Sequence, residues 1–232
     1  MMLLTGSENM VRDFYAYIGD ESYPCVAARA AVSREHIPCL IAGHIGCPAD
    51  DRRILDFLQD FVKSFRKANA MLHSAAIIFT GPRELTEEAF DHFMWNRLQA
   101  LSDLDAQTFR YDKRVSFDPS KATFSFSLAE EAFFIIGMHP ASSRRSRQFG
   151  YPAIVFNPHV QFQQLREKNR YDKMKNIVRS RDKLYSGSVN PMLQDFGEAS
   201  EAYQYSGRQY DNNWKCPFKV AHEKHDDHST QK

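Results

Sequence analysis

The chain of 232 residues has no apolar run that approaches the roughly 20 residues needed to span a membrane. Its first residues, 1–9, contain no basic segment, and their apolar stretch is too short for a secretory signal peptide. The formal net charge is only +1, so the sequence lacks the strongly basic field that drives non-specific nucleic-acid binding. We therefore expect a cytoplasmic protein with neither membrane nor nucleic acid among its partners.

Cysteine is scarce, with four residues in the whole chain (Cys25, Cys39, Cys47 and Cys216). This number does not suggest a disulfide framework in a chain of this length, and reduced thiols fit a cytoplasmic location. The spacing of Cys39, His44 and Cys47 is roughly that of metal ligands but matches no standard zinc site, so zinc is disfavoured.

Several familiar functional motifs are also missing. The sequence contains no phosphate-binding Gly-x-x-x-x-Gly-Lys-Ser/Thr, no dinucleotide-binding Gly-x-Gly-x-x-Gly after a strand, no Cys-x-x-Cys and no His-Glu-x-x-His. None of these four signatures can therefore supply the function. What is present instead is an ordinary globular composition, with 43% hydrophobic and 25% charged residues.

The hydrophobic periodicity predicts alternating strands and helices. Helices are expected from Pro24 or just after it, over 49–71, from Thr86 to about 101, over 160–184 and, as a short one, over 196–205; strands are expected over 40–44, 75–80, 123–128, 132–137 and 153–156. The last three strands are expected to be neighbours, with 132–137 in the middle and buried on both faces. This pattern predicts a single α/β (α+β) domain with a mixed, largely antiparallel central sheet flanked by helices.

Two boundaries follow from local signals. Asn157 and Pro158 have the residue types of a helix N-cap and first helical position, so the helix of 160–184 is expected to begin there. Residues 221–232 have no apolar period and are expected to form a disordered tail behind a domain of residues 1–220.

The last third of the chain gathers polar residues in short clusters beside Gly and Pro, where binding and catalytic groups usually lie. His139 follows the apolar run 132–137, so it is expected at a rigid strand end, either as a ligand or base or as a structural histidine bonded to the backbone. His159 is expected in the first turn of a helix, with a nitrogen free to coordinate or simply packed there.

Other candidates lie close by in sequence. Arg144, Arg145 and Arg147 form a cluster that requires anions, either from the protein or from a ligand. Glu198 and Glu201 are three residues apart and would share a helix face, where they could hold a guanidinium or ammonium group or simply face solvent. Cys216 is either a thiolate whose pKa Lys215 lowers or a buried inert cysteine.

Taken in order, these clusters resemble the YqcI/YcgG family. The resemblance rests on Tyr23-Pro-Cys, His139-Pro-x-Ser-Ser-Arg, Phe156-Asn-Pro-His-x-Gln-Phe, Gly187-Ser-x-Asn-Pro-Met-Leu, Asp195-Phe-Gly-Glu, Gln204-Tyr-Ser-Gly-Arg and Cys216-Pro-Phe. It covers nearly the whole chain up to about Phe218.

The resemblance implies a haem b protein, because the studied relatives are haem-dependent enzymes that N-hydroxylate guanidino compounds, including arginine. It implies an axial iron ligand (His139 first, then His159, then Cys216) and propionate partners among Arg144, Arg147 and Arg208. Glu198 and Glu201 would then grip the substrate guanidinium, as catalytic residues of a monooxygenase.

Under this interpretation the partners are a guanidino or small amine substrate and an electron donor, and a homodimer is possible. Two alternatives stay open. The first is a haem-binding or haem-sensing protein without turnover. The second is a cofactor-free module that binds a small anion through the arginine cluster.

Overall fold

A computed structural model describes residues 6–68, 71–188, 192, 195–211 and 213–221. The helices in this part of the chain are α1 (Gly6–Gly19), α2 (Val26–Ser33), α3 (Asp51–Ala68), α4 (Glu87–Asp105), α5 (Val160–Glu167) and α6 (Tyr171–Ser186), with short 3-10 turns η1 (Pro48–Asp50), η2 (Arg145–Arg147) and η3 (Glu201–Gln204). The strands are β1 (Cys39–His44), β2 (Ala75–Gly81), β3 (Phe126–Leu128), β4 (Glu131–Met138) and β5 (Ala153–Pro158).

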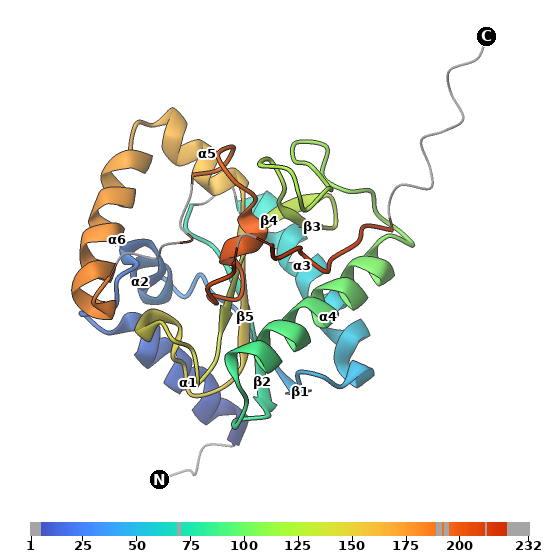
Figure 1. The fold of residues 1–232 in the computed structure, drawn as a ribbon, viewed down its shortest axis with the longest axis horizontal. Helices are drawn as coiled ribbons and strands as arrows, with labels where there is room; N and C mark the ends of the chain where they lie inside the picture. The colour runs from blue at the N-terminus through green and yellow to red at the C-terminus, as the bar shows by residue number, and fades with distance from the viewer. Residues whose placement is uncertain (1–5, 69–70, 189–191, 193–194, 212, 222–232) are drawn as a thin grey trace.

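The strands form one five-stranded sheet in the order β1-β2-β5-β4-β3. Only β1 and β2 pair in parallel, and the other three pairings are antiparallel. Helices α3 and α4 pack on one face of this sheet, and α1 and α2 lie on the other, with α6 beyond them (Figure 1). The predicted α+β class is therefore confirmed, as is the position of 132–137 between its two neighbours, although the predicted strand over 123–128 is limited to Phe126–Leu128.

Local sequence explains several boundaries. Helix α3 buries one face of its 18 residues through Ile54, Leu58, Phe61 and others, as its periodicity predicted. Thr86 caps α4 by accepting a hydrogen bond from the Ala89 N–H. Helix α2 begins just after Pro24, where the Cys25 sulfur accepts from the Ala28 N–H. Helix α1, by contrast, was not predicted from the apolar and aromatic stretch that it contains.

The prediction that Asn157 and Pro158 start a helix is wrong, because both residues belong to β5. The Asn157 side chain bridges the sheet instead of capping a helix: it donates to the Phe134 carbonyl (3.0 Å) and accepts from the Ser74 hydroxyl (2.7 Å). The prediction of one helix over 160–184 is also wrong. The chain turns at Lys168–Arg170, where Asn169 has φ +54°, so that α5 and α6 are separate helices.

The predicted helix over 196–205 is reduced to the 3-10 turn η3, which begins at Glu201. Residues 222–232 and the motif residues Asn190 and Pro191 lie outside the described residues, so the disordered tail stays a prediction. Within the described ranges, no helix combines the length and the apolar composition that crossing a membrane requires.

Successive side chains of β4 point to opposite faces of the sheet. Phe133 and Ile135 join the core under α3 and α4, whereas Ile136 and Met138 face α1 and α2. Gly137 lies on the α4 side, where the Phe90 ring occupies the space that a side chain would need. The strand therefore fixes which residues can reach each side.

Gly137→Ala is expected to destabilise the fold by roughly 1–3 kcal/mol, as overpacked core substitutions do. A Cβ at this position would lie 2.6 Å from Phe90 Cε1 and 3.0 Å from Met94 Sδ, so the α4 side chains would have to move. Urea unfolding of the variant measures the loss. Gly150→Ala is the matched control, because nothing lies within 4 Å of its added Cβ. Equal stability of both variants would show that the layer between β4 and α4 is not tightly packed.

Candidate functional site

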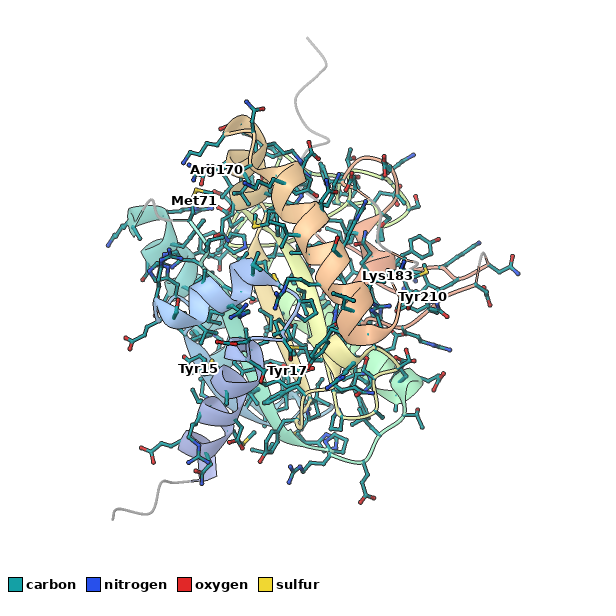
Figure 2. All side chains as sticks on the ribbon, turned by 90° about the vertical axis from the view of Figure 1, so that its left-hand side faces the viewer. Tyr15, Tyr17, Met71, Arg170, Lys183 and Tyr210 are labelled. Atoms are coloured by element: carbon teal, nitrogen blue, oxygen red, sulfur yellow. The ribbon has the colours of Figure 1, made fainter. Side chains whose placement is uncertain are left out.

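A cavity of about 320 Å³ lies on the α1 and α2 side of the sheet, and α6 contributes one of its walls. Strand β4 supplies a mainly apolar wall through Phe134, Ile136 and Met138, and α2 lines another side with alanines. Figure 2 shows α6 crossing in front of the sheet, from near Arg170 to near Lys183. A concave, mainly apolar cavity into which a few polar groups converge is the usual form of a small-molecule site.

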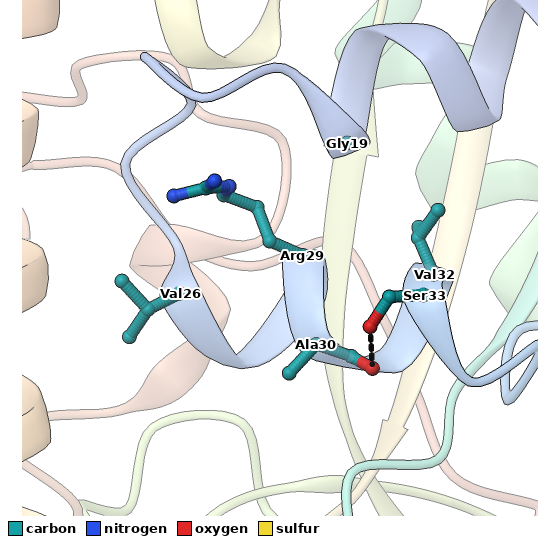
Figure 3. A pocket seen from close by; sticks show the side chains of 6 residues that line it. All are labelled: Gly19, Val26, Arg29, Ala30, Val32 and Ser33. Carbon is teal, nitrogen blue, oxygen red and sulfur yellow. Dashed lines mark hydrogen bonds between the residues drawn. The ribbon is translucent and has the colours of Figure 1, made fainter.

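A second hollow, of about 460 Å³, lies between the end of α1 and α2 (Figure 3). Arg29 is the one charged side chain among the six residues that line it, and the Ser33 hydroxyl is bonded to the Ala30 carbonyl. Because polar groups do not converge there, the cavity under α6 is the better candidate.

The most distinctive polar group of the cavity is a histidine paired with a carboxylate. His159 Nε2 lies 3.2 Å from Glu201 Oε1, and both residues line the cavity although they are 42 positions apart in the chain. The His159 backbone N–H donates to the Ala132 carbonyl at 2.7 Å, which fixes the residue just after β5. Its ring also contacts Phe196, with centroids 4.4 Å apart. The arrangement holds one imidazole in a defined orientation at the cavity wall.

Glu201 is itself held from the other side. It is only 5% exposed, and its Oε2 accepts a hydrogen bond from the fully buried Tyr205 hydroxyl at 3.4 Å. The Tyr205 oxygen in turn accepts from the Phe126 N–H at 3.0 Å. A carboxylate with such defined partners can hold an imidazole in one orientation.

Two of the predicted arginines reach the cavity. The Arg144 guanidinium is ion-paired with Asp182 on α6 and donates to the Ser188 carbonyl at 3.0 Å. Arg147 donates to three main-chain carbonyls: Gly137 (2.9 Å), Tyr205 (3.1 Å) and Gln204 (3.2 Å). Burial lowers the pKa of Arg147, and the nearby Arg144 charge acts in the same direction. Arg147 thus connects β4, through hydrogen bonds, to the segment that carries Glu201.

Arg208 does not line the cavity; it is ion-paired with Glu88 (3.2 Å) and lies 3.9 Å from Asp91, both on α4. Cys216 is also elsewhere, packed against the core under α3 and α4. Burial raises the pKa of its thiol to about 12, so the prediction that Lys215 lowers this pKa is wrong. The inert, half-buried cysteine is the alternative that the structure supports.

His139, the first choice for an iron ligand, is fully buried on the other face of the sheet and does not line the cavity. Its ring stacks on Phe90 of α4, with centroids 4.3 Å apart, and neither ring nitrogen has a hydrogen-bond partner. Burial lowers the pKa of His139 to about 4, and the positive charge of Arg147 lowers it further. His139 therefore faces the core on the α4 side and not the cavity.

The two glutamates do not share a helix face. Glu198 is exposed and accepts from the Asp195 N–H at 3.1 Å, whereas Glu201 is buried at the start of η3. The helix that would have aligned them does not form, because Gly197 adopts a left-handed conformation (φ +94°) before it.

Sequence reasoning missed the contribution of α6. Its cavity-lining residues recur at the spacing of one helix face: Tyr171, Met174, Lys175, Val178, Arg179 and Asp182. The sequence already contains this spacing, which indicates a helix face that combines apolar and charged residues. His73, also at the cavity wall, gave no such signal, because it lies in a loop before β2.

No group of three or more His, Cys, Asp or Glu residues in the described part of the chain could hold a metal ion by itself. The cavity instead combines one oriented imidazole, arginines and apolar walls.

The fold is an α+β sheet protein, and the cavity under α6 brings His159, Glu201, Arg144 and Arg147 together with apolar side chains of β4. The chain belongs to the YqcI/YcgG family, whose sequence pattern matches residues 14–219. It is 25% identical over 213 residues to the uncharacterized protein YqcI of Bacillus subtilis (strain 168), an alignment that covers 87% of this chain and 83% of that protein. No solved structure matches the chain.

Proposed function

We propose that this protein is a haem-dependent N-oxygenase that hydroxylates a guanidino compound such as arginine, or a small amine, in the cavity under α6. The observation that carries the proposal is the composition of the cavity wall: the His159–Glu201 pair, an apolar β4 surface and the arginines 144 and 147 line one space. These are the group types that a haem protein needs for its iron, its macrocycle and its propionates.

The residues present fit haem b. The porphyrin itself provides four of the iron ligands, so one protein imidazole is enough to complete the site. Haem therefore does not require the group of three metal-binding side chains that is missing from the described residues. His159 would hold the iron through Nδ1, because it lines the cavity and its Nε2 is bonded to Glu201, whereas His139 does not line the cavity and His73 is stacked on His36. Arg147 and Arg144, the latter while keeping its ion pair with Asp182, would attract the propionates, whereas Arg208 is paired with Glu88 of α4.

Haem, when bound, supplies the oxygen activation that N-hydroxylation requires. The chain provides the surroundings of that chemistry. Glu201 holds the His159 imidazole in one orientation, as outer partners of metal-bound histidines do. The apolar side chains of β4 exclude water from the reacting nitrogen. Glu201 is the glutamate of the predicted pair that lines the cavity, and its carboxylate would attract a substrate guanidinium toward this wall.

The test is a spectrum of the purified protein from about 350 to 650 nm, after expression with a haem precursor. We expect a Soret band that persists through gel filtration. Arginine, supplied with oxygen and a reductant or with peroxide, should then gain one oxygen atom, detected by mass spectrometry. A missing Soret band would overturn the proposal. A Soret band without turnover of guanidino compounds or amines would favour the haem-sensing alternative.

The cofactor-free alternative has one observation in its favour. The hydrogen bonds of the Arg147 guanidinium go to carbonyls and not to a carboxylate, so its charge is available to an anion in the cavity. Calorimetric titration with phosphate or succinate distinguishes this cofactor-free alternative from the haem-dependent function. Binding of such an anion by protein that shows no Soret band would favour this alternative.

A further inference from the structure

Helix α6 is attached to the rest of the protein in an unusual way. None of its 16 residues is buried, whereas α3, of similar length, buries seven. Its inner face contacts the cavity and not a packed core. Since helices are stabilised mainly by the burial of an apolar face, α6 can be displaced at a smaller cost than α3.

Both ends of α6 have conformations suited to a hinge. Asn169, just before the helix, has φ +54°, and Gly187, just after it, has φ +79°. Residues 168–170 connect it to α5, which remains fixed because Gln161 bonds both the N–H and the carbonyl of His73, each at 2.6 Å. Segments at helix ends commonly absorb the backbone rotation of a hinge.

The half of α6 away from α5 is fastened by a cluster around Asp182. One Asp182 carboxylate oxygen accepts a hydrogen bond from the Arg144 guanidinium, and the other accepts from the Ser146 hydroxyl at 3.1 Å. The side chains of Arg144 and Asp182 are only 9% and 13% exposed, so solvent screens their attraction weakly. The neighbouring Arg181 donates to the Tyr23 carbonyl at 3.2 Å, beside the start of α2.

The contacts nearer the hinge are weaker. Lys175 pairs with Asp195 at 2.7 Å and with the exposed Asp172 at 3.1 Å. Lys175 and Asp195 are 19% and 29% exposed, so their attraction is more strongly screened than that of Arg144 and Asp182. The strongest attachment of α6 therefore lies at the end opposite its connection to α5.

We propose that α6 is a lid that turns about residues 168–170 to open the cavity, and that the Asp182 carboxylate is the latch that holds it closed. Opening exposes the wall formed by α2, where Cys25 lines the cavity. The ion pair between Arg144 and Asp182 must break in each opening event. The mechanism applies whatever the cavity binds, so a missing Soret band would leave it intact.

The cysteines of the chain provide the test. Cys25 lines the cavity, Cys47 is exposed, and Cys216 packs against the core on the other face of the sheet. Alkylation by iodoacetamide, followed by mass spectrometry of each peptide, reports access from the cavity at Cys25, reagent activity at Cys47 and loosening of the α3–α4 side at Cys216. Asp182→Asn should raise the Cys25 rate tenfold or more relative to Cys47, while the Cys216 rate stays unchanged.

Asp172→Asn is the matched control, because it makes the same substitution on the same helix at an exposed position. It should leave the Cys25 rate within twofold of the wild type. An unchanged Cys25 rate in Asp182→Asn, or a Cys216 rate that rises in parallel, would overturn the lid. If Asp182→Asn does not fold, Ser146→Ala removes one hydrogen bond to the latch and must raise the Cys25 rate by a smaller factor; no rise there would overturn it as well.

Discussion

His159→Ala is expected to abolish stoichiometric haem binding, while His139→Phe is expected to leave the Soret band unchanged. His159 lines the cavity and is oriented by Glu201, whereas His139 lies behind the sheet against Phe90. Loss of an outer-shell partner alone typically costs roughly 10–100-fold in metal affinity, so loss of the ligand itself should cost at least that much. Haem titration followed at the Soret maximum measures the difference.

The phenylalanine variant is a fair control, because it keeps a ring stacked on Phe90 and removes only the two unpartnered nitrogens. The opposite result, in which His139→Phe loses the band and His159→Ala keeps it, would show that the iron ligand lies on the α4 side. Glu201→Gln should give an intermediate result: the His159 contact can persist, but the negative charge is gone.

Acidification from pH 7 to pH 4 is expected to remove about 3 kcal/mol of stability through His139 alone, because the pKa of this residue falls from an ordinary 6.5 to about 4 in the folded state. Between these two values the unfolded chain binds a proton that the folded chain does not. Stability therefore declines as the pH falls from about 6.5 to 4, and this contribution becomes constant below pH 4. The cause is burial without a hydrogen-bond partner, reinforced by the charge of Arg147.

Urea unfolding at several pH values measures this effect as the difference between the wild type and His139→Phe. The contributions of the carboxylates are common to both proteins and cancel in that difference. His92→Gln, at an exposed position on α4, is the control for the loss of a histidine from the same side of the molecule. Parallel curves for the wild type and His139→Phe would mean that His139 binds its proton equally well in both states.

Much of the fold could be predicted from the sequence. Helices α3 and α4 and strands β1, β2, β4 and β5 follow from apolar spacing, a capping Thr86 and β-rich runs, because these signals act within a few residues. The break between α5 and α6 could not be predicted in this way. The segment around Asn169 contains neither Gly nor Pro, and its charged residues suit a continuous helix. Local signals also failed at Asn157, where a residue type suited to a helix N-cap belongs to a strand instead.

The candidate site was predicted as a set of residues but not as an arrangement. His159, Glu201, Arg144 and Arg147 were expected in one functional region, and all four line the same cavity. His139, Arg208 and Cys216 belong to the same sequence clusters but lie against α4 and its core. An apolar strand such as β4 carries side chains on both faces, so its sequence does not reveal which face borders a cavity.

The sequence alone determined the class of fold, the family and the region that holds the polar residues, because periodicity and ordered motifs are written along the chain. Only the tertiary structure decided which of these residues meet. The His159–Glu201 contact joins residues 42 positions apart, and the Arg144–Asp182 pair joins η2 to α6. Such pairings depend on how the sheet orients each strand and on where the chain turns back, and no local pattern specifies either.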